Sequence, residues 1–185
     1  MKQKFNVITS TCAPLPLENV DTDQIIPARF LKATDKKGFG DNLFRDWRYN
    51  KDGTPKKDFV LNKPEFKDAV ILVAGKNFGS GSSREHAAIT LKAVGVGAVI
   101  AESFGRIFFR NAINLGIPAI VCKGIAGNVA DDDKLSIDLG SGEIKNLTTG
   151  KTFKAVPLSP YIMNILEHGG IKPMLKAEQD KKRNN

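Results

Sequence analysis

The chain has 185 residues, 41% of which are hydrophobic, and a formal net charge of +8. This length suffices for one domain with a proper core, and the composition excludes a disordered chain. The longest apolar runs, such as residues 69–74, are too short to cross a bilayer, and the N-terminal segment lacks the apolar stretch of a secretory signal. We therefore expect a cytoplasmic protein that does not enter a membrane.

The cysteines and the charge pattern narrow the possible ligands. Cys12 and Cys122 belong to no CxxC or Cys/His cluster, which disfavours a disulfide framework, a zinc site or an iron–sulfur cluster held by this chain alone. The basic residues are dispersed and gather only in residues 176–185, which we predict to be a flexible basic tail after a domain of residues 1–175. This dispersion disfavours nucleic acid and favours an acidic small molecule or an acidic partner surface.

The first third of the chain predicts little regular structure. Residues 5–31 indicate one or two strands, because Pro14, Pro16 and Pro27 oppose a long element. Residues 34–68 are polar and rich in glycine and proline, but they contain a group of aromatic residues that includes Trp47. We interpret them as an ordered insertion with its own small apolar anchor.

The middle of the chain predicts alternating strands and helices. Strands are expected at 69–74, 98–102 and 118–122, with helices at 83–95 and 103–116 between them. This β-α-β-α-β order implies parallel strands joined by right-handed crossovers.

The last part changes its hydrophobic period to two. From residue 130 to 156 apolar and polar residues alternate, with turn sequences between them, which predicts an antiparallel hairpin or meander. A final helix follows, with Ser159 as its cap, Pro160 at its first position and Gly169 just past its end. The fold class is therefore α/β, in a single mixed β/β/α domain with a βαβαβ centre and a C-terminal β-hairpin.

The loop "GKNFGSGSSREHA" at residues 75–87 is the candidate site. It follows a buried strand and precedes a helix, where an anion is favoured by free N–H groups and by the helix dipole. Gly79 and Gly81 allow the backbone to approach a ligand closely, and Arg84 can grip a carboxylate with two hydrogen bonds. A capping box of Ser82 and Glu85 explains part of the same sequence without any ligand, so both interpretations stay open.

Two separate motifs resemble the aconitase swivel-domain family, and within it the small subunits of 3-isopropylmalate dehydratases. One is the segment "GKNFGSGSSREHAAITLKAVGVGAVIAESFGRIFFRNAINLGIP", and the other is "NVDTDQIIPARFL" at residues 19–31. The segment "GFGDNLFRDWRY" at residues 38–49 is similar to the bacterial form. The resemblance implies a hydro-lyase subunit of leucine biosynthesis that acts on a small dicarboxylate and is active only with a large subunit.

The resemblance also implies roles for the loop. Ser82 matches the serine that acts as an alkoxide base, while Ser83 and Arg84 match residues that bind a substrate carboxylate, beside the permissive Gly81. In the family a [4Fe–4S] cluster on the large subunit supplies the Lewis acid for loss of hydroxide, so this chain is expected to bind no cofactor of its own.

The first motif is expected to line the substrate pocket. By resemblance, Phe30, Leu31 and Lys32 lie in the loop that reads the substrate's side group, where the first two suit an isopropyl group and the lysine suits a third carboxylate. The alternative is a hydrophobic turn that anchors Phe30 in the core. Residues Asp21, Thr22 and Asp23 are a possible pocket wall, although turn formation and capping are commoner uses of this sequence than metal binding.

Several residues carry competing interpretations. Arg106 and Arg110 are expected either on a partner surface or on an exposed helix face, and the run of three aspartates at 131–133 is expected to be a solvated turn. His86 is expected to pack locally and His168 to contact the carbonyls that end its helix. The functional alternatives are a related dehydratase acting on homocitrate, citramalate or another methylated malate, or a carboxylate- or phosphate-binding module without chemistry.

Overall fold

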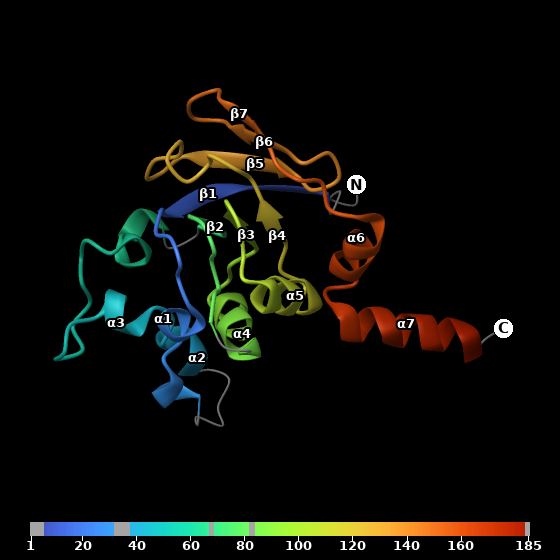
Figure 1. The fold of residues 1–185 in the computed structure, drawn as a ribbon, viewed down its shortest axis with the longest axis horizontal. Coiled ribbons are helices and arrows are strands. Elements are labelled where there is room, and N and C mark those ends of the chain that lie inside the picture. The colour runs from blue at the N-terminus through green and yellow to red at the C-terminus, as the bar shows by residue number, and fades with distance from the viewer. Residues whose placement is uncertain (1–5, 32–37, 67–68, 82–83, 184–185) are drawn as a thin grey trace.

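A single curled sheet organises the protein, whose computed structural model describes residues 6–31, 38–66, 69–81 and 84–183. The strand order is β4-β3-β2-β1-β5-β6-β7 (Figure 1). The parallel strands are β1 (Val7–Leu15), β2 (Ile71–Ala74), β3 (Ala98–Ala101) and β4 (Ala119–Val121). The antiparallel strands are β5 (Lys134–Asp138), β6 (Glu143–Asn146) and β7 (Thr152–Lys154). The predicted βαβαβ centre and the antiparallel C-terminal part are both confirmed.

The sheet curls so that its two ends approach each other. The N–H of Val156, just after β7, donates to the carbonyl of Val121 in β4 at 2.9 Å. Side chains on the concave face therefore form an enclosed core, which contains Cys12, Ile71, Val73, Ala98, Ile100, Ile120, Cys122, Ile125, Leu135, Ile137, Leu139, Ile144 and Ala155.

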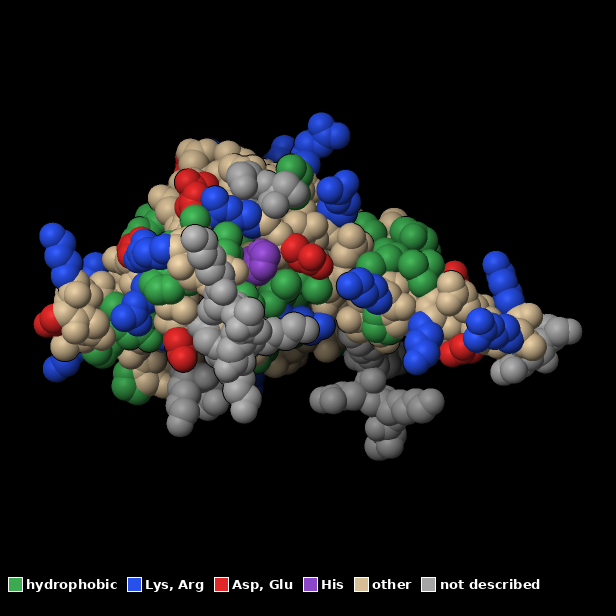
Figure 2. Space-filling model, turned by 90° about the horizontal axis from the view of Figure 1, so that it is seen from below, with side chains coloured by type: hydrophobic (Ala, Val, Ile, Leu, Met, Phe, Trp, Pro, Cys, Tyr) green, Lys and Arg blue, Asp and Glu red, His purple; other side chains and the backbone are tan. Residues whose placement is uncertain are grey.

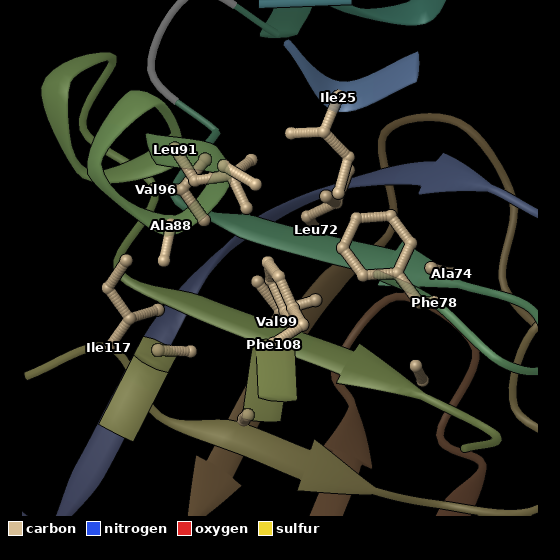
Figure 3. Close-up of a cluster of buried hydrophobic side chains, with 14 of the residues drawn as sticks. Ile25, Leu72, Ala74, Phe78, Ala88, Leu91, Val96, Val99, Phe108 and Ile117 are labelled. Atoms are coloured by element: carbon tan, nitrogen blue, oxygen red, sulfur yellow. The ribbon is translucent and has the colours of Figure 1, made fainter. Parts of the chain in front are cut away.

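The opposite face of the parallel strands carries a second core beneath the helices. Helices α4 (Glu85–Ala93) and α5 (Arg106–Asn114) lie against this face (Figure 1). Leu72 and Ala74 of β2 point into it, together with Phe78 and Phe108, as Figure 3 shows. Both faces of β2 and β3 are buried, which explains why these strands are continuous apolar runs in the sequence.

Strand β1 is longer than the prolines of its sequence suggested. It pairs with β5 through Val7–Thr11 and with β2 through Cys12–Leu15. Pro14 therefore has a strand partner only on the β2 side. On its other side no strand is paired with it, so the missing N–H of Pro14 removes no hydrogen bond from the sheet there. The expectation that prolines would prevent a long element here was wrong for this reason.

The insertion consists of short helices that join the main core. They are α2 (Gly38–Asp41), α3 (Arg45–Arg48), η2 (Val60–Asn62) and η3 (Pro64–Phe66). Phe44 is fully buried and stacks on Trp47 with a centroid separation of 5.5 Å, and Phe39 and Leu43 belong to the core beneath the helices. The aromatic group therefore anchors the insertion to the domain rather than forming a separate small core.

The C-terminal part ends in two helices. Helix α6 (Pro160–Glu167) is capped by the Ser159 hydroxyl, as predicted, and the Nδ1–H of His168 bonds to the Asn164 carbonyl at 2.8 Å. Helix α7 (Ile171–Arg183) follows and extends away from the body of the molecule (Figure 1), and Figure 2 shows basic side chains along this extension. The expected tail from residue 176 is thus helical as far as residue 183, since lysine, glutamate, glutamine and alanine are good helix formers.

One member of the aspartate run is structural. Asp133 is only 4% exposed, and its Oδ2 accepts hydrogen bonds from the Asn146 side chain at 2.6 Å and the Ala130 N–H at 2.8 Å. The interpretation of the whole run as a solvated turn was wrong for this residue. Its carboxylate ties the segment before β5 to the end of β6.

Candidate functional site

Three chain segments meet at the carboxyl ends of β2 and β3. The N–H of Thr22 donates to the Ser80 carbonyl at 2.9 Å, and the N–H of Gly105 donates to the Phe78 carbonyl at 2.9 Å. Residues 77–81 of the loop are therefore held by backbone hydrogen bonds on both sides. This fixation is the kind of support that a precisely positioned polar site requires.

Glycines allow the three segments to touch. Gly79 has a φ of +74°, and a Cβ added there would lie 2.2 Å from Cγ of Phe108. A Cβ on Gly105 would lie 2.4 Å from the carbonyl oxygen of Gly79, so the loop and the start of α5 are in backbone contact. Gly81 also has a positive φ, of +93°, beside Asp21. A Cβ at position 79 or 105 would push these segments apart, whereas at 81 the positive φ alone favours glycine.

Arg84 connects this loop to the first motif. Its Nη1 donates to Oδ1 of Asp23, and the same oxygen accepts the Ala28 N–H at 3.1 Å. The Arg84 side chain is 20% exposed, so its guanidinium is oriented by Asp23 while part of it still reaches solvent. The pairing of these two residues, 61 positions apart, could not be read from local patterns.

The start of α4 differs from the predicted capping box. The helix begins at Glu85, its N-cap residue is Arg84, and Arg84 makes no side-chain capping hydrogen bond. Glu85 is therefore the first helical residue, not the third as a box with Ser82 requires. Ser82 and Ser83, the predicted base and carboxylate ligand, lie outside the described residues, as does Lys32.

Asp21 has a local structural use. It caps α1 (Thr22–Ile25) in a full capping box: its Oδ1 accepts the Gln24 N–H at 2.8 Å, and its own N–H donates to Gln24 Oε1 at 2.8 Å. Thr22 is buried behind it. Among the described residues no three His, Cys, Asp or Glu side chains group as metal ligands would.

The predicted specificity residues lie just after α1. Phe30 ends the short helix η1 (Ala28–Phe30), and Leu31 follows it as the C-cap. Both side chains are half-buried and pack against the core beneath the helices, and the Arg29 guanidinium lies 4.6 Å from the centroid of the Phe30 ring. The structure therefore brings Phe30, Leu31, Asp23 and Arg84 to one region through the hydrogen bond at Ala28.

An open hollow of about 590 Å³ lies beside the loop. Its walls are Asn77, Gly79, Ser80, Gly81, Gly105, Arg106, Ile107 and Arg110. Sequence reasoning missed Asn77, which has a φ of +56° and bonds to the Asn19 side chain at 2.9 Å. Asparagine tolerates this backbone conformation better than most residues, which was the available signal.

The two thiols lie in the concave core, away from the loop, and His86 has a packing contact at the start of α4. Burial, with the nearby Asp133 carboxylate, raises the pKa of the Cys12 thiol to about 12, and burial raises the pKa of Cys122 to about 11. Both are free and buried in the concave core, so neither is suited to ligate a cofactor. His86 packs with its ring centroid 5.5 Å from that of Phe39.

Nowhere in the described ranges is a helix both long and apolar enough to span a membrane.

Comparison with known proteins places this geometry in a family. Residues 2–123 match the Aconitase C-terminal domain family. The chain is 51% identical over 157 residues to the 3-isopropylmalate dehydratase small subunit of Christiangramia forsetii, covering 81% of this chain and 76% of the relative. It is 49% identical over 166 residues to the isopropylmalate/citramalate isomerase small subunit of Methanocaldococcus jannaschii, covering 86% and 89%.

A solved structure agrees with the sequence relatives. The crystal structure of 3-isopropylmalate dehydratase from Methanocaldococcus jannaschii superposes with a TM-score of 0.80 at 34% identity, covering 96% of this chain and 98% of that one. The predicted resemblance and fold class are thereby confirmed. The chain belongs to the Aconitase C-terminal domain family, among the small subunits of 3-isopropylmalate dehydratases.

Proposed function

We propose that the chain is the small subunit of a hydro-lyase that interconverts 2- and 3-isopropylmalate in leucine biosynthesis. The names of its relatives support the substrate, and the ion pair between Arg84 and Asp23 at the glycine loop is the structural observation that carries the assignment. A guanidinium held beside a loop at the start of a helix suits a carboxylate ligand.

The proposed reaction removes water and adds it back in the opposite orientation. A base takes the proton from the carbon next to a carboxylate, the neighbouring C–O bond breaks, and hydroxide leaves as the double bond forms. Water then adds with its hydroxyl on the other carbon, so the two substrates are isomers and no electron acceptor is needed.

The loop residues divide this work. We assign the base to Ser82 and carboxylate binding to Ser83, Arg84 and the backbone of Gly81. A serine alkoxide needs stabilisation by N–H groups and cations, and the start of α4 together with Arg84 offers both. Arg84 would hold the substrate carboxylate in the orientation that Asp23 imposes on its guanidinium.

Phe30, Leu31 and Lys32 are assigned to the substrate's side group. Half-buried Phe30 and Leu31 can present apolar surface to an isopropyl group without leaving the core. Citramalate is the second candidate substrate, because a relative at 49% identity is named for both compounds. Asp21 and Thr22 would form the adjoining wall, with Asp21 fixed by its capping role.

The iron–sulfur cluster that this family implies is assigned to the large subunit. The described residues of this chain do not fit such a group, because Cys12 and Cys122 are buried in the concave core. When bound, the cluster supplies a Lewis acid that assists loss of hydroxide. The small subunit contributes the base and the carboxylate grip.

Reconstitution tests the proposal. The purified chain alone should be inactive, and adding the large subunit should give isopropylmalate isomerisation. Ser82→Ala should reduce kcat by about 10²–10⁴-fold, the usual contribution of a positioned base, and leave assembly intact. Ser80→Ala is the matched control, since the hydroxyl of this serine in the same loop makes, among the described residues, only a long 3.4 Å hydrogen bond to the Asn19 carbonyl.

Two outcomes would contradict the assignment. Full activity of Ser82→Ala in the complex removes Ser82 from the chemistry. Absence of turnover with every candidate malate, despite binding of dicarboxylate to the chain, favours a binding module without catalysis.

A further inference from the structure

Two arginines on α5 lack any partner within the described part of the chain. Arg106 and Arg110 are both exposed on the first turns of the helix, and neither side chain makes a hydrogen bond, ion pair or ring contact with the residues described. Positions four apart lie on the same face of a helix, about 6 Å apart at Cβ. The two charges therefore form a local cationic strip.

The other described arginines in the body of the domain differ in this respect. Arg29 and Arg84 are paired with carboxylates, and Arg45 and Arg48 stack on an aromatic ring. The isolation of the α5 pair is thus not a general property of surface arginines in this protein.

The position of the pair is unfavourable for α5 itself. The first helical residue is Arg106, no acidic residue lies in the first turn, and the N-cap residue, Gly105, has no side chain that could accept from the free N–H groups. Cations are disfavoured at the positive end of a helix, and like charges four apart repel. Residues that destabilise their own helix or strand, and whose cost no contact within the chain offsets, are expected at functional positions.

The strip forms one wall of the hollow beside the glycine loop. The opposite wall is the loop from Asn77 to Gly81, which leads directly to Ser82. Ile107 lies between the arginines in sequence and is 37% exposed, so the wall presents apolar surface as well as charge. Exposed arginines beside apolar surface are typical of protein interfaces.

We propose that this hollow is a docking surface for an acidic segment of the large subunit, carboxylates of which pair with Arg106 and Arg110. The inference rests on the proposed function, which requires that subunit. A protein segment fits better than the small dicarboxylate, because the hollow is open and both cations are exposed. Covering them with a partner would remove solvent screening at the same time as it supplies the missing charges.

Binding measurements with the purified large subunit test the inference. Arg106→Glu/Arg110→Glu should raise the Kd for the large subunit at least 10-fold and weaken its dependence on salt between about 50 and 200 mM. Lys151→Glu/Lys154→Glu changes the charge equally near β7 and should bind like the wild type. Turnover of either variant complex, measured at saturating large subunit, should stay near the wild-type value.

The outcomes separate the two proposals. Unchanged Kd in the double arginine variant overturns the docking surface while the proposed function stands. Unchanged Kd with a raised KM assigns the arginines to substrate and also overturns it. If the glutamates prevent folding, judged by circular dichroism, Arg106→Gln/Arg110→Gln gives the same test with a smaller expected change. A wild-type chain that binds no large subunit overturns the proposed function and this inference with it.

Discussion

The contact between Gly79 and Phe108 gives the sharpest prediction. In Gly79→Ala the new Cβ would lie 2.2 Å from Cγ and 2.4 Å from Cβ of Phe108, a fully buried side chain of α5. Because the collision involves the start of that side chain, a rotamer change of the ring cannot relieve it. The loop must move away from α5, and we expect both stability and activity to fall.

The expected loss has two parts. A left-handed backbone conformation costs an alanine roughly 1–2 kcal/mol relative to glycine, and overpacking a core costs about 1–3 kcal/mol more. At about 2–4 °C per kcal/mol for a domain of this size, the melting temperature should fall by roughly 4–20 °C.

A second glycine isolates the backbone part of this loss. Gly124→Ala is the control, because Gly124 has a φ of +76° but nothing lies within 4 Å of its added Cβ. Thermal denaturation followed by circular dichroism should show a much smaller drop for the control. Equal melting temperatures for the two variants would refute the steric argument, and full activity of the Gly79→Ala complex would show that the loop position is not critical.

Two further predictions concern the arginine and the thiols. Arg84→Lys should raise KM and lower kcat of the reconstituted enzyme, because an ammonium cannot bind Asp23 and a carboxylate in the fork geometry of a guanidinium. Arg45→Lys, which loses its stacking on Tyr49, is the control. Unchanged kinetics for Arg84→Lys would remove Arg84 from the site. Cys12 and Cys122 should not react with a thiol reagent at pH 8 until the protein is unfolded. Their folded pKa values of about 12 and 11 lie above the ordinary thiol pKa of 9.0, so their contribution to stability should be complete below pH 9 and lost as pH rises through pH 11–12. Cys12→Ala should flatten that alkaline loss, whereas rapid labelling of both thiols in the native protein would contradict their burial.

Sequence reasoning predicted those helices and strands whose position in the chain depends on the local sequence alone. Strands β2 and β3 are short apolar runs buried on both faces, and α6 has Ser159 and Pro160 at its start, so their positions follow from pattern alone. Strand β1 did not, because the tolerance of Pro14 depends on which neighbour stands on each side of it. The same reason applies to Asp133, whose burial depends on a partner in β6.

The candidate site shows the same division. The glycine loop was recognisable, because a positive φ favours glycine at both 79 and 81 and close approach to Phe108 requires it at 79. The start of α4 was misplaced, since "SSRE" satisfies a local capping rule that the backbone does not use. What orients Arg84 is an aspartate 61 residues earlier, and only tertiary structure brings the two together.

Oδ1 of Asp23, which accepts the hydrogen bond from Arg84, also links the carboxylate site to the residues of the proposed specificity. Oδ1 of Asp23 also holds the N–H of Ala28, the first residue of η1, which carries Phe30. A shift of η1 that enlarges or narrows the space beside Phe30 therefore changes the hydrogen bonding of the same oxygen that positions the guanidinium. In the proposed enzyme, the residues that read the side group and the residue that grips the carboxylate would not vary independently. A change of substrate size should then require compensating changes at both places, and substitutions at Phe30 alone should lower kcat as well as alter preference.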